Sequence, residues 1–491
     1  MKQLCKFILI LFFIIAPKIL LPQDRKVIEL TLEKAIKIAQ QNSPMIMQAK
    51  NSYLVAYWSY YSYKASNLPS LSLTSNPDWI NNINKITQSD GSNLFLHQNQ
   101  LNNNVMLSVS QRIWFTGGTF SVNSRLVRLD DFIGETTRYQ SSPIEVAYQQ
   151  PLLGYNSMKW DRNMYPIRFK MSKKEYNVAL EEVAKEACHY FYNLAIAQTN
   201  LDIATSNYAT ADTLHRYAKG RYNIGTITEN EMLQLEIKKL SEEVNKIDAK
   251  VRVEDVMHSY LSFLGIKEDV ELKLKLDNNI PLFTVPVEDA VRYAYNNNPL
   301  LERNELARLE SKKQLEYAKA SQRLNTDFFV KFGLSQASDK ILNVYNNPTN
   351  QLYVSIGISI PILDWGKGKA QINIAQSNID LVETRVNQEI KDFTFNVRRT
   401  VNKFNLQSNY VNIAAKTNTI AERRFDIAKR LYLQGNSTIL DLNSAIAEKD
   451  SNIRNYVQAL SEYWQLYYKI RSLTGYDFKN NQKIEDNLPD K

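Results

Sequence analysis

The chain has 491 residues, of which 44% are hydrophobic and 23% charged, and its formal net charge at pH 7 is +9. This composition is typical of a folded protein of two or three domains and excludes a disordered or low-complexity chain. The 60 Lys and Arg residues are scattered beside Asp and Glu along helical stretches, which favours solvated helix faces over a nucleic-acid site.

The N-terminus has the pattern of a signal peptide. Lys2 and Lys6 precede an apolar run from Phe7 to Ala16, and polar sequence begins at Gln23. The run is short for a membrane span, so the pattern predicts export with removal of residues 1–22, in preference to an N-terminal anchor helix. The exported chain would keep one cysteine, Cys188, and could form no internal disulfide.

The chain repeats itself at two offsets. Residues 30–36 match 285–291 and residues 42–44 match 297–299, both at an offset of 255. Residues 150–153 match 360–363 and residues 221–225 match 431–435, both at an offset of 210. The two offsets differ by 45, which places 45 extra residues in the first half, between Pro44 and Pro151.

Each half contains the pattern of a long helical hairpin with a glycine, Gly225 or Gly435, at its tip. A heptad seam steps by three and four along Ala187, Tyr190, Leu194, Ala197, Leu201, Ala204, Tyr208 and Ala211. After Gly225, Thr228 and Glu231 have the spacing of a capping box. A second helical pattern follows along Leu233, Ile237, Leu240, Val244, Ile247 and Val251.

Four segments alternate between apolar and small or polar residues, at 105–109, 144–148, 328–334 and 354–360. Alternation alone fits a membrane barrel wall and a soluble sheet equally, and the signal peptide and long hairpins favour the barrel. Two strand pairs cannot close a barrel, so closure would need symmetric copies. Gly117-Gly118 predicts a further hairpin, which we expect to stand beyond the barrel rather than add strands to it.

The hairpin tips resemble those of the TolC family of outer-membrane efflux channels, whose pattern is an aromatic residue, a glycine three residues later and an acid six residues after that. Tyr222, Gly225 and Glu231 carry it in the first half, and Tyr432, Gly435 and Asp441 in the second. The segments 151–156 and 361–366, which precede the long helices, are also similar to the family's. The resemblance extends from about residue 30 to residue 476.

The resemblance implies a mainly α fold with β: a trimer of internally duplicated chains, in which a long α-helical barrel of coiled-coil hairpins continues into a transmembrane β-barrel. The trimer would lie in the outer membrane and span into the periplasm, as a passive conduit of a tripartite efflux or type I secretion system. Its partners would be a periplasmic adaptor, or membrane fusion, protein and an inner-membrane pump, and no ATP, metal or other cofactor is expected.

The expected organisation follows the two repeats, with segments 30–49 and 272–294 forming a belt around the waist. The segments are 1–22, the signal peptide; 23–66, equatorial and helical; 67–151, strands with the extra hairpin; 152–270, the first long hairpin; 271–326, equatorial and helical; 327–361, strands; 362–476, the second long hairpin; and 477–491, a tail.

The resemblance also assigns roles at the tips. Gly225 and Gly435 would receive the adaptor, and the pore constriction would be formed by Asp441, Glu231, Tyr432 and Tyr222. Ser437 and Ser444 stand where related channels often carry an arginine and a second acid. The polar contacts that tie adjacent hairpins together at the constriction are therefore expected to be weaker. Alternatively, the two acids only favour the start of the following helix, where negative charge meets the positive helix end.

Enzyme activity is not expected. The four histidines, His97, His189, His215 and His258, lack metal-ligand spacing. Gly366-Lys367-Gly368-Lys369 lacks the upstream glycine of a phosphate-binding loop and instead predicts the start of a long helix. The competing function is a periplasmic coiled-coil adaptor or scaffold without a pore, although adaptors usually have one hairpin and this chain has two.

Overall fold

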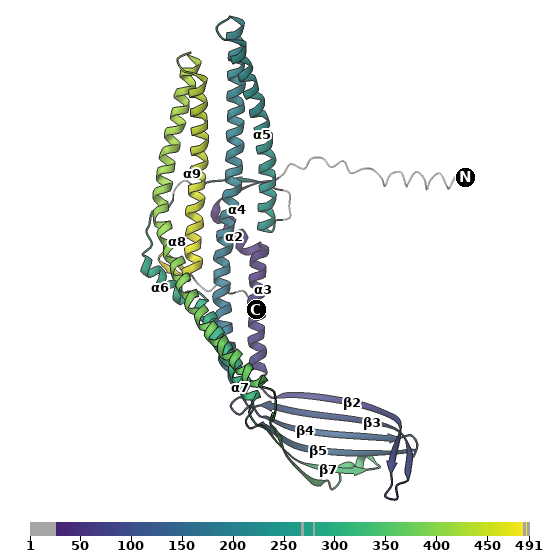
Figure 1. The fold of residues 1–491 in the computed structure, drawn as a ribbon. Coiled ribbons are helices and arrows are strands. Elements are labelled where there is room, and N and C mark those ends of the chain that lie inside the picture. The colour runs from purple at the N-terminus through teal and green to yellow at the C-terminus, as the bar shows by residue number, and fades with distance from the viewer. Residues whose placement is uncertain (1–25, 267–269, 278–279, 485–487, 489–491) are drawn as a thin grey trace, which may run out of the picture.

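The computed structural model describes residues 26–266, 270–277, 280–484 and 488, so the predicted signal peptide lies outside the described residues. The chain is elongated, with two long helical hairpins at one end, small elements around the middle and a curled sheet at the other end (Figure 1). Among the described residues, no helix combines the length and apolarity needed to cross a lipid bilayer.

The elements follow in two similar series. The first contains β1 Lys26–Leu30, α2 Leu32–Asn42, α3 Pro44–Ala65, β2 Ser70–Thr87, β3 Asn93–Arg112, β4 Thr119–Asp131, β5 Thr136–Pro151, α4 Ser157–Asn223 and α5 Glu229–Leu264. The second contains β6 Val270–Leu274, α6 Val287–Asn297, α7 Leu300–Ser321, β7 Asn325–Ser338, η1 Ile341–Tyr345, β8 Thr349–Ser359, α8 Lys367–Leu433 and α9 Ile439–Thr474, followed by the short strands β9 Tyr476–Asp477 and β10 Gln482–Lys483.

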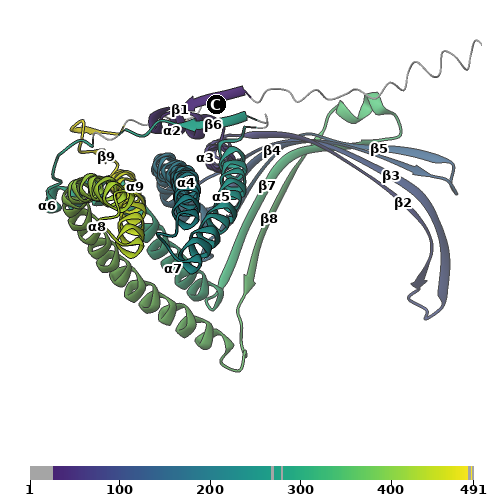
Figure 2. The ribbon, with the colours of Figure 1, turned by 90° about the horizontal axis from the view of Figure 1, so that it is seen from above.

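The two long hairpins have matching lengths. Helices α4 and α8 have 67 residues each, and α5 and α9 have 36 each. At 1.5 Å per residue, a helix of this length spans on the order of 100 Å. Helix α8 begins at Lys367, as its glycine-rich start predicts. Because α5 packs on α4, α4 on α9 and α9 on α8, the four helices form a curved layer with α5 and α8 at its edges (Figure 2).

The predicted seam on α4 is confirmed as the inner packing face of this layer. Ala187 and Leu194 are fully buried, and Ala204 and Ala211 are nearly so. The corresponding face of α8 is buried as well, at Val397, Phe404 and Val411. The apolar residues predicted on α5 behave differently, because all six, Leu233, Ile237, Leu240, Val244, Ile247 and Val251, are exposed in the single chain.

The waist holds the main apolar core together with a buried ion network. Strands β1 and β6 pair in parallel across the two halves of the chain. The Arg471 guanidinium donates to both carboxylate oxygens of Glu181, at 2.7 and 2.8 Å, and to Asp477 at 2.7 Å. These charges are buried, so their mutual pairing is what makes the burial tolerable.

Both halves use a left-handed glycine to end the hairpin at the waist. Gly265 ends α5 at φ +73°, and Gly475 ends α9 at φ +58°. Each lies against the last residue of a short helix: a Cβ on Gly265 would approach Asn42 to 2.5 Å, and a Cβ on Gly475 would approach Asn297 to 2.7 Å. Glycine is therefore required twice over, for its backbone conformation and for the close contact.

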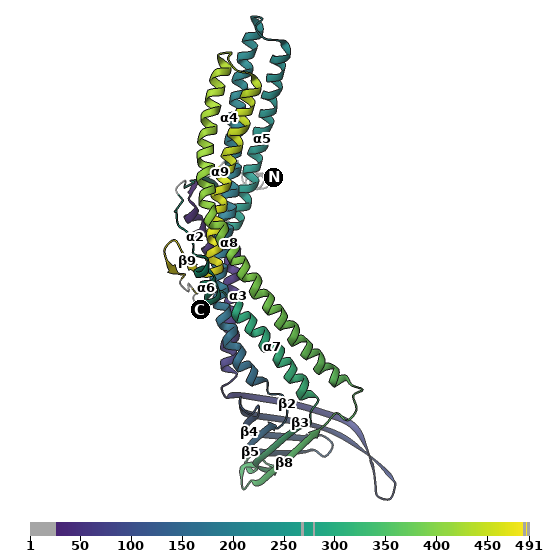
Figure 3. The ribbon, with the colours of Figure 1, turned by 60° about the vertical axis from the view of Figure 1, so that its left-hand side comes forward.

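The sheet has six antiparallel strands in the order β2-β3-β4-β5-β7-β8, and it lies at a large angle to the long helices (Figures 1 and 3). The four predicted segments lie mainly within β3, β5, β7 and β8, and β2 and β4 are additional. Gly117-Gly118 lies in the turn between β3 and β4. Because β4 pairs with β3 and β5 along its length, this hairpin forms part of the same sheet, and its expected place beyond the barrel stays a prediction.

Only the outer part of the β2–β3 hairpin extends past its neighbours. The pairing of β3 with β4 ends at Gln100, whereas its pairing with β2 continues to Asn93 and Thr87. The ribbon beyond Gln100 is rich in Asn and Gln, which explains why its sequence did not stand out as a strand.

Candidate functional site at the hairpin tips

The two tips have the same turn geometry. Gly225 donates to the carbonyl of Tyr222 at 2.9 Å, and Gly435 donates to the carbonyl of Tyr432 at 3.0 Å. Both glycines have positive φ, +73° and +78°, where other residues are strained. A Cβ on either one would meet nothing within 4 Å, so both glycines face open space in the single chain.

The two predicted acids cap the helices that follow. Thr228 accepts from the backbone N–H of Glu231 at 3.2 Å, and the Glu231 carboxylate accepts in return from the N–H of Thr228 at 3.3 Å. Asp441 forms the same reciprocal pair with Thr438, at 3.2 and 3.4 Å. The predicted capping box at Thr228 is confirmed, and a second one is present at Thr438.

Asp441 is fixed by further hydroxyl groups. The Thr438 hydroxyl donates to its carboxylate at 2.7 Å, and Ser437 donates to the same oxygen at 3.3 Å. Hydrogen bonds from the side chain and backbone of Thr438 lower the pKa of this exposed carboxyl group. Ser437 therefore supports the charged form of Asp441.

The tips of the two hairpins pack together through a small apolar cluster. Leu214, Ala218 and Leu235 from the first hairpin meet Phe425, Leu442, Ala445 and Ile446 from the second. Tyr432 is half-buried against this cluster. Burial raises the pKa of Tyr432, the charge of Arg221 lowers it, and the charge of Glu231 raises it. The charge of Glu231 on the first hairpin therefore acts on Tyr432 on the second.

The other predicted contacts are not made within one chain. Tyr222 is 38% exposed, and among the described residues neither tip tyrosine donates its hydroxyl to Glu231 or Asp441. The hydroxyl that links the tips belongs to Tyr217, which donates to the carbonyl of Leu433 at 2.9 Å.

Sequence reasoning missed two charged groups near this site. Arg221 lies close enough to affect Tyr432, and the charge of Arg424 contributes to the lowered pKa of Asp441. A signal for Arg221 was present, because the second repeat has Leu431 at the matching position and the charge breaks the duplication.

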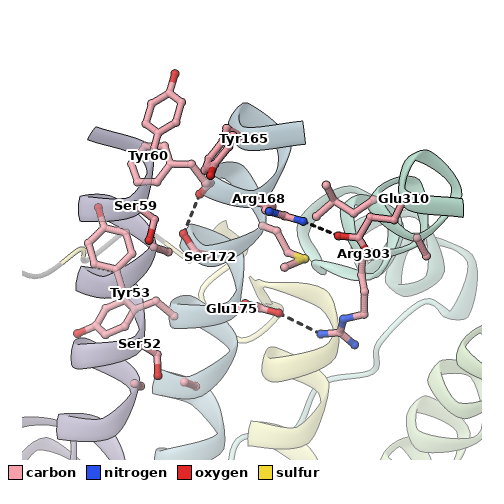
Figure 4. A pocket seen from close by; sticks show the side chains of 18 residues that line it. Ser52, Tyr53, Ser59, Tyr60, Tyr165, Arg168, Ser172, Glu175, Arg303 and Glu310 are labelled. Atoms are coloured by element: carbon pink, nitrogen blue, oxygen red, sulfur yellow. Dashed lines mark hydrogen bonds and ion pairs between the residues drawn. The ribbon is translucent and has the colours of Figure 1, made fainter. Parts of the chain in front are cut away.

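A separate hollow of about 750 Å³ lies far from the tips, between α3, α4 and α7 (Figure 4). Aromatic rings line it, and its charged groups pair with one another: Arg303 with Glu175 at 3.2 Å, and Arg168 with Glu310. This pairing identifies a packing region between helices. In the described part of the chain, no group of three or more His, Cys, Asp or Glu side chains is arranged to hold a metal ion.

Solved structures of outer-membrane proteins and channels share this fold. The CmeC outer membrane channel of Campylobacter jejuni has a TM-score of 0.66 at 14% identity, over 92% of this chain and 87% of that one. VceC of Vibrio cholerae has a TM-score of 0.63 at 13% identity, over 92% and 97%. The open state of the MtrE channel of Neisseria gonorrhoeae has a TM-score of 0.60 at 13% identity, over 92% and 90%.

The chain therefore has the fold that these proteins share. Residues 291–476, from within α6 to just after α9, match the outer membrane efflux protein family. No curated protein is similar enough in sequence to count as a match. The family match and the shared fold confirm the resemblance to TolC-type channels.

These findings support an outer-membrane efflux channel subunit and do not favour an adaptor or scaffold without a pore. They also imply a location in the outer membrane. The family is one of non-enzymatic transport conduits.

Proposed function

We propose that three copies of this chain close into one passive conduit, which runs from the cell exterior through the outer membrane and into the periplasm. The observation that carries the proposal is a pair of apolar seams exposed on the two edge helices. On α5 the seam consists of Leu233, Ile237, Leu240, Val244, Ile247 and Val251. On α8 it consists of Leu406, Tyr410, Ile413, Ile420 and Ile427.

The α5 seam steps by three and four residues, and the α8 seam steps by four, three, seven and seven, so both follow the seven-residue period of coiled-coil partners. A single chain leaves them in water, which is costly for so many large apolar side chains. Packing α8 of one copy against α5 of the next buries both seams at once. A head-to-tail contact of this kind generates a ring when its rotation closes, and the family resemblance gives the number of copies as three.

Internal duplication supports the same arrangement. The two hairpins have long helices of equal length, the same tip turn and the same kind of glycine contact at the waist. They can therefore occupy nearly equivalent positions in one wall. We infer that the two halves arose by duplication and that the three copies contribute equivalent hairpins around the ring.

The tips supply both docking and gating in this proposal. Gly225 and Gly435 present backbone with no side chain, which leaves room for an adaptor hairpin between neighbouring helices. Asp441 and Glu231 from each copy would converge in the throat, where their charges favour cations and exclude anions. Tyr222 and Tyr432 would donate to carboxylates of adjacent hairpins. A periplasmic adaptor and an inner-membrane pump would complete a tripartite efflux or type I secretion system.

Cell fractionation tests this function against the adaptor alternative. We expect the chain in the outer-membrane fraction, migrating as a heat-modifiable trimer that becomes a monomer on boiling. Recovery from the soluble periplasm, or a stable monomer in detergent, would count against the conduit.

A further inference from the structure

One row of apolar residues continues across all six strands of the sheet. In the pairing register, Leu71 in β2 lies opposite Val109 in β3, and the row continues through Val122, Val146, Phe332 and Leu352. Each member is exposed or only partly covered in the single chain. A row of this kind is what a barrel wall presents to lipid.

The opposite face is polar along an equally continuous row. It runs through Ser72, Ser108, Asn123, Glu145, Gly333 and Gln351. Ser108 donates to Asn123 at 2.6 Å, and Asn123 donates to Glu145 at 3.3 Å. Lys331 completes the chain of contacts with an ion pair to Glu145 at 3.0 Å. Strands β2 and β4, which lie outside the four predicted segments, therefore also have one apolar face and one polar face.

The edges of the sheet also match. Within the described residues, strands β2 and β8 each have one side without a paired strand, and in lipid every unpaired backbone group costs several kcal/mol. Strand direction alternates across six strands, so β8 of one copy meets β2 of the next in the antiparallel sense. The 11 residues of β8 are enough to cross the hydrocarbon layer.

We propose that all six strands of each copy form the outer-membrane wall, with β8 of one copy paired to β2 of the next, giving eighteen strands in the trimer. With strands about 4.8 Å apart and tilted by about 40°, eighteen strands enclose a backbone diameter of about 36 Å, against about 24 Å for twelve. The exit therefore admits hydrophilic cargo as wide as a folded polypeptide segment, and the size limit of the conduit lies at the helical tips. This inference rests on the proposed trimer.

Disulfide cross-linking tests the edge pairing. A cysteine at Ser355 in β8 is combined with one cysteine at each polar-face position of β2 in turn, Ser70, Ser72, Thr74, Asn76 and Asp78. The matched set combines Ser355→Cys with cysteines at Ser121, Asn123 and Arg125 in β4. The native Cys188 is fully buried and gives little background.

We expect oxidation to link neighbouring copies through at least one β2 position and through none in β4. Links to β4 would mean that β2 and β3 lie outside the wall, which would overturn the proposal. An intact trimer with no link to β2 would also overturn it. Native mass spectrometry of the same samples distinguishes failure of the β8–β2 pairing from failure of the proposed trimer. Absence of any trimer would contradict the proposed function itself.

Polymer exclusion tests the width. Trimers carrying Tyr432→Phe and Glu231→Gln are placed in planar bilayers, and neutral polymers of graded size are added on the side of the sheet. A polymer of about 20 Å diameter should enter a wall of about 36 Å and lower the conductance, whereas a wall of about 24 Å narrowed by side chains would exclude it. Exclusion of this polymer from the sheet side would overturn the eighteen-stranded wall.

Discussion

Asp441 has two compatible roles at the residue scale, as a helix cap and as a charge in the proposed throat. The hydroxyl and backbone groups of Thr438 lower its pKa, so it remains ionised at neutral and mildly acidic pH. Replacing it with Asn keeps an oxygen acceptor for the cap but removes the charge.

We expect Asp441→Asn to reduce cation preference and block by multivalent cations in planar-bilayer recordings. The matched control is Asp426→Asn, which removes the same charge from an exposed position on α8 before the tip. Unchanged selectivity in Asp441→Asn would leave the carboxylate as a helix-end group only.

Asp477 links stability to pH at the waist. Burial alone would raise its pKa, but hydrogen bonds and charge from Tyr467, Arg471 and Asn480 bring the pKa below its usual value. A lowered folded pKa means that the carboxylate stabilises the fold above its unfolded pKa of about 4, and that this contribution is lost as the pH falls through the folded pKa.

Thermal unfolding in detergent from about pH 7 to about pH 3 measures this effect. The wild-type chain should be more stable than Asp477→Asn at pH 7, and the difference should narrow toward pH 3. A difference that stays constant across this range would show that Asp477 acts through packing alone.

At the scale of elements, a glycine with positive φ follows the end of a helix in two different environments. Gly435 and Gly475 both have positive φ, but a Cβ meets open space at the first and Asn297 at the second. Gly435→Ala should cost about 1 kcal/mol of backbone strain. Gly475→Ala should add an overpacking cost of about 1–3 kcal/mol and lower the melting temperature further. Equal losses would show that the waist contact relaxes freely.

Docking is tested by a larger side chain at the tip. Gly435→Trp points into open space within the chain, so it should leave trimer abundance intact while blocking the adaptor and abolishing export. Gly435→Asn is the control, since Asn tolerates positive φ. If export persists with tryptophan at both Gly225 and Gly435, the adaptor docks elsewhere.

The elements show where sequence reasoning succeeds and where it stops. The α4 seam and the first capping box were predictable because period and spacing act locally. Strand β2 was missed because Pro77 lies near its middle and its outer half is rich in Asn, and both residue types lower strand propensity. The role of α5 could not be decided, because the same apolar period serves burial within a chain and burial between chains.

The tip site was only partly predictable for a related reason. Spacing locates Gly225, Gly435 and the two acids, and the helix caps follow from it. Arg221 and Tyr217 come close to the second hairpin only through the packing of α4 on α9, and nothing local to their sequence indicates that contact.

At the scale of the whole molecule, the exposed seam on α5 should hold the ring together. Ile247→Gln with Val251→Gln removes two apolar members, and glutamine is at least as good a helix former as either residue. Asp248→Gln with Lys250→Gln is the matched control on the same turn, with no change in net charge. Native mass spectrometry should show less trimer in the seam variant only, and an undisturbed trimer would show that the α5 seam is not needed to hold the subunits together.

Single-channel recording of the purified trimer in a planar bilayer tests most directly whether this chain forms a conduit. We predict a small resting conductance for the wild type and a larger one when Tyr432→Phe is combined with Glu231→Gln, because the tips then lose contacts between adjacent hairpins. A trimer that inserts into the bilayer but conducts no ions, in both the wild type and this variant, would contradict the account.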